Sequence, residues 1–197
     1  MAISKTYSAQ LIGLNTHILS IEVDLSNGLH SFAIVGLPDK AVEEAKDRVS
    51  SAIKNSGYVS PKQKNQKVVV SLAPADIRKE GSGFDLAIAI GYLLASGDLN
   101  FDFRDKLFLG ELSLEGKIRK INGVLPIIKG VKSMGFKEIF IPKDNVKEAS
   151  LISGINIYGV ESLNDLIDHL NNKKNCILKP EKLTHIKYKD EIYETDF

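Results

Sequence analysis

The segment from Val69 to Gly123 constrains the fold of this chain more than any other part of the sequence. It begins with an apolar run, continues through the loop sequence KEGSGF and enters the stretch DLAIAIGYLLAS at residues 85–96. Because this stretch is apolar nearly all round, it predicts a helix buried at the centre of the molecule. A strand over residues 107–114 follows and ends at a Glu115-Gly116 turn. The order strand, loop, buried helix and strand favours an α/β domain.

The N-terminal 36 residues predict three further strands, over residues 7–14, 17–25 and 30–36. Apolar and polar residues alternate through the second of these segments, as expected for a strand with one buried face. Asn27-Gly28 is a turn signal because both residues tolerate positive φ. The simplest interpretation is a three-stranded antiparallel meander.

Helical signals alternate with strand signals in the rest of the chain. Asp39 is the expected N-cap of a helix with one apolar stripe, which Gly57 ends. After a helix over residues 124–134, short strands and helices alternate up to residue 170, which predicts strands covered by helices. We therefore expect one α/β domain over residues 1–170, and a polar linker or extension over residues 171–197.

Composition places the chain among ordinary globular proteins. Hydrophobic residues make up 43% and charged residues 26% of its 197 residues, and the net charge is +1. Any binding to a polyanion therefore requires a local basic patch. With no apolar run of about 20 residues and no signal-peptide core, we expect a cytoplasmic protein without a membrane partner. The single cysteine, Cys176, excludes an internal disulfide, and the scattered histidines give no metal-ligand spacing, so we expect no bound metal.

Six segments of the sequence resemble the N-terminal domain of the ComM/YifB family of Mg-chelatase-like AAA+ proteins. They are SFAIVGLPDKAVEEA (31–45), RVSSAIKNSG (48–57), LAPAD (72–76), KEGSGFDL (79–86), FLGELSLEG (108–116) and NGVLP (122–126). The resemblance covers most of residues 1–170. It implies a two-layer fold like the Lon proteolytic domain, a mixed sheet with helices packed on one side. It also implies that the polar tail leads toward an AAA+ module absent from this chain.

The function implied by this resemblance is that of a non-catalytic N-terminal domain. In the ComM branch such a domain would serve ring assembly and DNA guidance in an AAA+ ATPase, a DNA helicase for branch migration in natural transformation or recombination. The implied partners are DNA and copies of the same protein in a hexameric homo-oligomer. ATP and Mg²⁺ are expected only for the AAA+ module, because the chain contains no G-x-x-x-x-G-K-[ST] phosphate-binding loop and hence no cofactor site of that kind.

The catalytic positions of a Lon-type protease are degenerate in this sequence. Lon-type hydrolysis requires a serine hydroxyl beside a lysine amine that accepts its proton. The resemblance places the nucleophile at Gly83 or Phe84 and the lysine at Ile127, and none of these side chains can perform the chemistry. Two alternatives remain open: a Lon-like peptidase in which Ser82 acts with Lys79 or Lys129 in an unusual geometry, and a protein-interaction module for a partner ATPase.

Three other features bear on function. Lys62, Lys64 and Lys67 share a polar loop, and Arg78 and Lys79 lie beyond the far end of the strand that follows. These five residues are the candidate DNA-binding residues, because such side chains neutralise phosphates, although an ordinary solvated loop would have the same composition. The loop Gly81-Ser82-Gly83 lacks the third glycine of a dinucleotide fingerprint and is better explained as a tight turn, with Asp85 capping or charging the helix start. We expect Glu111 to form an ion pair with Arg78 or Arg119.

Overall fold

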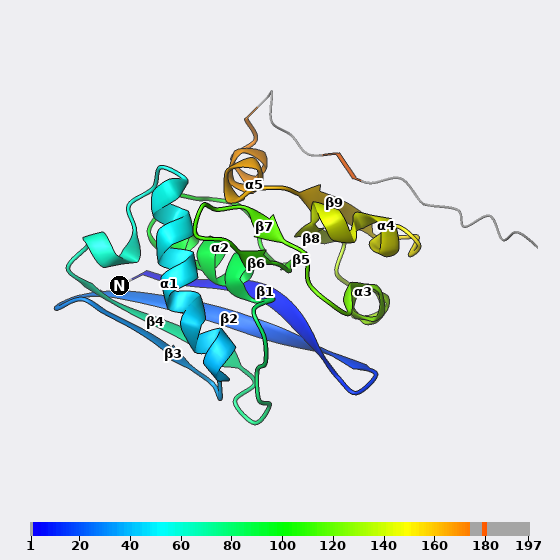
Figure 1. The fold of residues 1–197 in the computed structure, drawn as a ribbon, viewed down its shortest axis with the longest axis horizontal. Coiled ribbons are helices and arrows are strands. Elements are labelled where there is room, and N and C mark those ends of the chain that lie inside the picture. Colours follow the sequence, from blue (N-terminus) through cyan, green and yellow to red (C-terminus); the bar gives the residue numbers. More distant parts are fainter. Residues whose placement is uncertain (1, 174–178, 181–197) are drawn as a thin grey trace, which may run out of the picture.

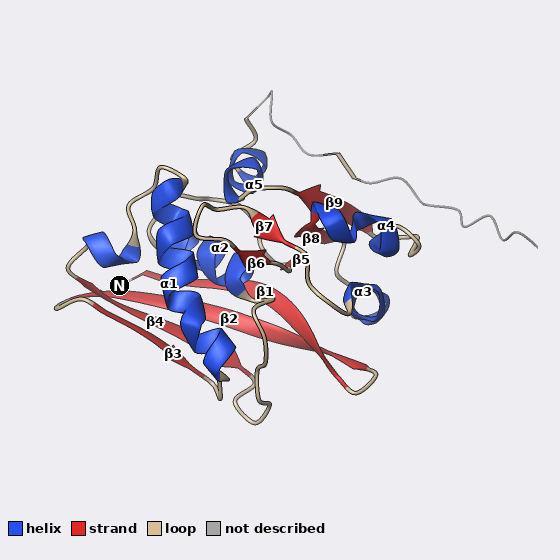
Figure 2. Ribbon diagram, in the orientation of Figure 1, coloured by secondary structure: helices blue, strands red, loops and turns tan. Residues whose placement is uncertain are grey.

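A computed structural model describes residues 2–173 and 179–180, and it confirms the α/β class with a mixed sheet and helices (Figures 1 and 2). Cys176 and most of the predicted extension over residues 171–197 lie outside the described residues. Among the described residues, no helix combines the length and apolarity needed to cross a membrane.

The largest sheet has four strands in the order β1-β2-β4-β3. β1 (Ala2–Ile12), β2 (Asn15–Asn27) and β4 (Gln66–Ala73) are antiparallel neighbours, and β3 (Ser31–Val35) is parallel to β4. The predicted meander is therefore wrong, because β4 lies between β2 and β3. The physical reason is the helix between β3 and β4, which permits the crossover that parallel neighbours require.

Helices α1 (Lys40–Asn55) and α2 (Asp85–Ala95) lie side by side on one face of this sheet (Figure 1). The predicted boundaries of α1 are confirmed. The Val42 amide donates to Asp39 Oδ1 at 2.8 Å, and Gly57 follows the C-cap with φ +85°. Sequence-local capping thus determines both ends of α1.

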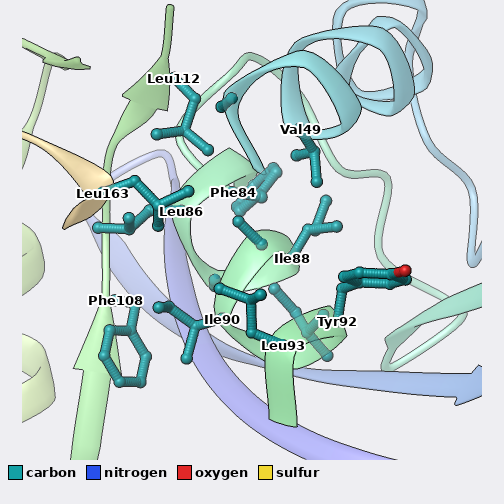
Figure 3. Packing of buried hydrophobic residues seen from close by; sticks show 14 of the residues in the cluster. Val49, Phe84, Leu86, Ile88, Ile90, Tyr92, Leu93, Phe108, Leu112 and Leu163 are labelled. Atoms are coloured by element: carbon teal, nitrogen blue, oxygen red, sulfur yellow. The ribbon is translucent and has the colours of Figure 1, made fainter. Parts of the chain in front are cut away.

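Helix α2 is the buried helix that its sequence predicts. Every residue from Asp85 to Leu93 is buried, and Figure 3 shows apolar side chains of other elements around α2, including Val49, Phe108 and Leu163. Asp85 occupies the first turn, but the N-cap residue is Phe84, which makes no side-chain capping bond. The expectation that Asp85 charges the helix start is correct, and the alternative that it caps the helix is wrong.

The second half of the chain contains a parallel sheet in the order β5-β8-β9. Its strands are β5 (Lys106–Phe108), β8 (Glu138–Pro142) and β9 (Asn156–Val160). The helices of this half are α3 (Val124–Ser133), α4 (Val146–Ala149) and α5 (Leu163–Leu170), with the 3-10 turn η2 (Lys143–Asn145) before α4. This confirms the predicted alternation. The other 3-10 turn, η1 (Pro61–Gln63), lies in the first half, between α1 and β4.

The strand predicted over residues 107–114 is broken into two parts. β5 ends at Phe108, and β6 (Glu111–Leu112) pairs with β7 (Ile118–Arg119) in a separate two-stranded sheet. Gly110 separates the parts with φ +155°, and a Cβ there would lie 2.7 Å from Ile118 Cγ2. The close approach of β7 therefore requires glycine at the bend.

The hairpin of β1 and β2 has helices on both faces. On one face, Thr6 Oγ1 donates to the Ala87 carbonyl of α2 at 3.0 Å. On the opposite face, Thr16 Oγ1 donates to the Pro126 carbonyl of α3 at 3.1 Å. The expected arrangement with helices on one side holds for α1 and α2, whereas α3 contacts the other face of the hairpin, where a second apolar core forms.

Candidate functional site

A cavity of about 810 Å³ opens where the end of β1 meets the loop over residues 76–84 and the loop over residues 120–122. Gly83, Phe84 and Ile127, the degenerate Lon-type positions, all lie in its wall. The structure therefore brings these three positions together around one space. None of the three side chains carries a nucleophile or a base.

Side chains of neighbouring elements fix the loop over residues 76–84. Gln10 Nε2, from β1, donates to the Arg78 carbonyl at 2.8 Å. The Gly81 amide donates to Asp39 Oδ2 at 3.1 Å, so the same carboxylate caps α1 and holds this loop. Backbone bonds of Lys79 to the segment before α1 add a third attachment. This wall of the cavity is therefore preorganised.

The opposite wall depends on one buried amide side chain. Asn145 is fully buried; its Nδ2 donates to the Ile121 carbonyl at 2.8 Å, and its Oδ1 accepts from the Ile121 amide at 3.0 Å. Because both polar groups of the Ile121 backbone are engaged, the loop over residues 120–122 has a defined position beside the cavity.

Ser82, Glu111 and Arg119 form a hydrogen-bonded chain at the cavity. Ser82 Oγ donates to Glu111 Oε2, and Arg119 Nη1 donates to Glu111 Oε1 at 3.2 Å. The ion pair expected for Glu111 is thus confirmed, with Arg119 as the partner. The hydrogen bond from Ser82 and the charges nearby lower the pKa of Glu111. The Ser82 hydroxyl therefore donates to a carboxylate that Arg119 also engages.

Arg48 and Asp85 form a second charged pair behind the cavity loop. Arg48 Nε donates to Asp85 Oδ2 at 2.6 Å, and the Leu112 amide donates to the same oxygen at 3.1 Å. Burial raises the pKa of Asp85, and the Arg48 guanidinium opposes that rise. Sequence reasoning missed Arg48. The available signal was a carboxylate at the start of an otherwise apolar helix, which requires a cationic partner when buried.

The structure does not assemble the serine–lysine pair of the peptidase alternative. Lys79 is fully buried, and its Nζ donates to the Pro74 carbonyl. Lys129 is exposed on α3, and the Ser82 hydroxyl is engaged by Glu111. Among the described residues, the hydrogen bonds of Ser82 and Lys79 thus run to other partners, and the peptidase alternative stays a prediction.

The structure separates the candidate DNA-binding residues into two regions. Lys62 and Lys67 are exposed, Lys64 is half-buried, and all three lie at or before the start of β4. Arg78 is exposed beyond the other end of β4 and lines the cavity. The buried Lys79 cannot reach a phosphate on the surface, so its assignment as a DNA contact is wrong.

Metal and nucleotide sites are not supported by the residues that the structure describes. Within residues 2–173 and 179–180, no group of three or more His, Cys, Asp or Glu side chains could hold a metal ion. The Gly81-Ser82-Gly83 loop does not fit a phosphate, because the first turn of α2 already carries the carboxylate of Asp85.

Comparison with known proteins identifies the relatives of the chain. Residues 21–145 match the protein family described as subunit ChlI of Mg-chelatase. Competence protein ComM of Haemophilus influenzae is 41% identical over 182 residues, which is 92% of this chain and 35% of ComM. The uncharacterized protein YifB of Escherichia coli is 41% identical over 155 residues, which is 78% of this chain and 30% of YifB.

A more distant similarity concerns a protease. Lon protease 2 of Bacillus subtilis is 33% identical over 99 residues, which is 49% of this chain and 18% of that protein. The chain spans about a third of the length of ComM and YifB. On the family match over residues 21–145, the chain belongs to the ChlI family of Mg-chelatase-like proteins, with ComM and YifB among its relatives.

Proposed function

We propose that this chain acts as the non-catalytic N-terminal domain of a ComM-like AAA+ ATPase. In that protein it serves ring assembly and guides DNA during branch migration, in natural transformation or recombination. The observation that carries the proposal is the similarity to ComM over 92% of the chain, combined with a cavity whose Lon-type positions are Gly83, Phe84 and Ile127. In this proposal the chain keeps the scaffold of a Lon-type domain and carries other side chains at the positions needed for hydrolysis.

The proposal assigns ATP and Mg²⁺ to an AAA+ module in a longer protein. The residues of this chain contribute neither a phosphate-binding loop nor a metal cluster within the described part. Its proposed partners are DNA and further copies of the same protein, in a cytoplasmic hexameric ring.

DNA guidance is assigned to the surface of Lys62, Lys64 and Lys67. Lys62 pairs with Asp47 at 2.6 Å, and both side chains are more than half exposed. An exposed ion pair contributes little stability, so a DNA phosphate can replace Asp47 at low cost. Each phosphate that a lysine neutralises releases counterions and makes binding dependent on salt.

The test compares two triple variants of the full chain. Lys62→Ala/Lys64→Ala/Lys67→Ala removes the proposed surface, and Lys129→Ala/Lys132→Ala/Lys147→Ala removes three exposed charges of α3 and α4 as a matched control. Affinity for a labelled four-way DNA junction is measured by fluorescence anisotropy at about 50 and 200 mM salt. We expect the first variant to lose about tenfold or more in affinity and to show a smaller salt dependence.

Three results would contradict the proposal. Equal loss of affinity in both triple variants would mean that total charge, and no defined surface, attracts DNA. Absence of both DNA binding at low salt and self-association in analytical ultracentrifugation would refute the role in ring assembly and guidance. Casein turnover that disappears in Ser82→Ala would instead show that the chain is a peptidase.

A further inference from the structure

The free edge of β1 faces the cavity. The strand order places β1 at the edge of the four-stranded sheet, where it lies beside β5 without pairing to it (Figure 1). Residues 9–13 line the cavity without interruption. Because successive side chains of a strand point to opposite faces, an uninterrupted run indicates that the backbone edge lines the space.

Contacts on the two faces of β1 support this orientation. On one face, Gln10 holds the loop over residues 76–84 through the Arg78 carbonyl. On the other face, Leu11 packs so closely on the start of α3 that a Cβ at Gly123 would lie 2.8 Å from Leu11 Cδ1. The two walls of the cavity therefore flank β1, and the strand edge lies between them.

The backbone groups on this edge have no partner among the described residues. In an antiparallel pair, every second residue directs both its N–H and its C=O away from the neighbouring strand. All residues of β1 from 2 to 12 are in register with β2, and no hydrogen bond joins the outer edge of residues 9–12 to another described segment. An open edge of this kind is a template for pairing with an added strand.

The cavity walls suit a polypeptide better than a polyanion. Ile77 and Ile121 contribute partly exposed apolar surface, and Ile12 is 44% exposed, whereas Phe84 and Ile127 form a nearly fully buried floor. Gly83 leaves space, since an added Cβ would meet only Ile121 Cδ1, at 3.8 Å. The charged lining residues are Arg78 and Lys120 together with Asp76, Glu80 and Glu111. With acidic groups at least as numerous as basic ones, the cavity does not attract phosphates.

We propose that this cavity binds an extended, apolar segment of another protein as an added strand on the edge of β1. Main-chain hydrogen bonds to residues 9–12 provide affinity, and alternate side chains of the segment contact the apolar wall. The proposal involves binding alone, without cleavage of the bound segment. The proposed peptide binding is separate from DNA guidance. Lys62, Lys64 and Lys67 lie at the N-terminal end of β4, whereas the cavity lies beyond its C-terminal end.

The first experiment measures binding of an unfolded probe to the full chain. Fluorescein-labelled α-lactalbumin, reduced and alkylated so that it stays unfolded, is titrated by anisotropy, with native α-lactalbumin as the comparison. Gly83→Leu places a side chain in the cavity, at a position where φ lies outside the left-handed range and an added Cβ meets only ordinary contact. Ala33→Leu adds the same group at an exposed site on β3.

We expect the unfolded probe to bind and the native protein not to bind. Gly83→Leu should weaken binding by at least about tenfold, whereas Ala33→Leu should leave it unchanged. Equal affinities of the two variants, or equal binding of native α-lactalbumin, would overturn the proposal.

Hydrogen–deuterium exchange of the unmodified chain gives a readout that does not depend on any variant. Added strand pairing should slow amide exchange in residues 9–13 when the unfolded probe is present. Protection confined to other segments would overturn the proposal even if the probe binds. An excess of junction DNA should not displace the probe, and displacement would show that one surface serves both ligands.

Discussion

Arg48 of α1 donates two hydrogen bonds to the carboxylate of Asp85 at the start of α2, at 2.6 and 3.1 Å. The Asp85 side chain is 1% exposed. The Leu112 amide of β6 donates a further hydrogen bond to its carboxylate. One carboxylate thus joins two helices and a strand directly behind the loop that lines the cavity. The pair is therefore a structural anchor for the Gly81–Phe84 wall.

Removal of the Arg48 side chain should lower the free energy of unfolding of the chain. Arg48→Met leaves the buried carboxylate of Asp85 without its cation, so we expect a loss of about 3–5 kcal/mol in the free energy of unfolding. The double variant Arg48→Met/Asp85→Leu should recover most of this loss, because no uncompensated charge remains. Urea unfolding measures the free energy of unfolding of the single and the double variant. A loss below about 1 kcal/mol in the single variant would show that the pair is not an anchor.

Glu111 should contribute stability that depends on pH. The Ser82 hydrogen bond and Arg119 lower its pKa from the ordinary value of 4.5 in the folded state. Protonation then favours the unfolded chain, so the contribution is present above about pH 4.5 and is lost as pH falls through the lowered folded pKa. Glu111→Gln should therefore be less stable than the unmodified chain at pH 7, and the difference should shrink in acid.

Urea titrations between about pH 7 and pH 3.5, on either side of the ordinary Glu pKa, test this dependence. Glu80→Gln is the matched control, because its ion pair with Arg78, at 3.7 Å, is 70% exposed on both sides and contributes little. A stability difference for Glu111→Gln that stays constant with pH would contradict the prediction.

The buried side chain of Lys79 should not be needed for the stability of the fold. Lys79→Met replaces an ammonium in the interior with an apolar side chain of similar length, and we expect about 1 kcal/mol of added stability at pH 7. Burial lowers the pKa of Lys79, so the unfolded chain binds this proton more tightly than the folded chain. The advantage of methionine should therefore be full below the lowered folded pKa and should disappear as pH rises toward 10.5, the ordinary value.

Thermal unfolding over a series of pH values checks the prediction for Lys79→Met. Its affinity for junction DNA should equal that of the unmodified chain, because the side chain is fully buried. A loss of DNA affinity with stability retained would show that Lys79 becomes accessible to the ligand.

The contact between α3 and the β1–β2 hairpin should depend on Gly130. A Cβ at Gly130 would lie 2.3 Å from Thr16 Oγ1 and 2.4 Å from Thr16 Cβ, which displaces the hydroxyl from the Pro126 carbonyl. We expect Gly130→Ala to destabilise the chain by about 1–3 kcal/mol, although alanine favours a helix. Gly83→Ala, whose Cβ meets only ordinary contact, should have little effect. Differential scanning calorimetry compares the two, and equal melting temperatures would contradict the prediction.

Several features of the fold could be predicted from short stretches of sequence. The Asp39 cap and Gly57 encode the ends of α1, and the all-round apolarity of residues 85–96 encodes the burial of α2. The position of β4 could not be predicted in this way. The alternation in residues 18–25 reports that one face is buried and does not report which strand becomes the neighbour.

The candidate site shows the same division. The glycine-rich loop and the absence of a serine–lysine pair at Gly83, Phe84 and Ile127 follow from the sequence and its family resemblance. The pairing of Ser82 with Glu111, 29 positions away, and of Arg48 with Asp85, 37 positions away, arises only when α1, α2 and β6 pack together.

The α/β class and the buried helix could be predicted from the amino-acid sequence alone, because periodicity, capping and side-chain chemistry act over a few neighbouring residues. The tertiary structure alone decided that Lys79 is buried, that Arg78 lies apart from the Lys62–Lys67 loop, and that the edge of β1 is open to a cavity. Burial and edge pairing depend on which distant segments come into contact, and local sequence does not specify those contacts.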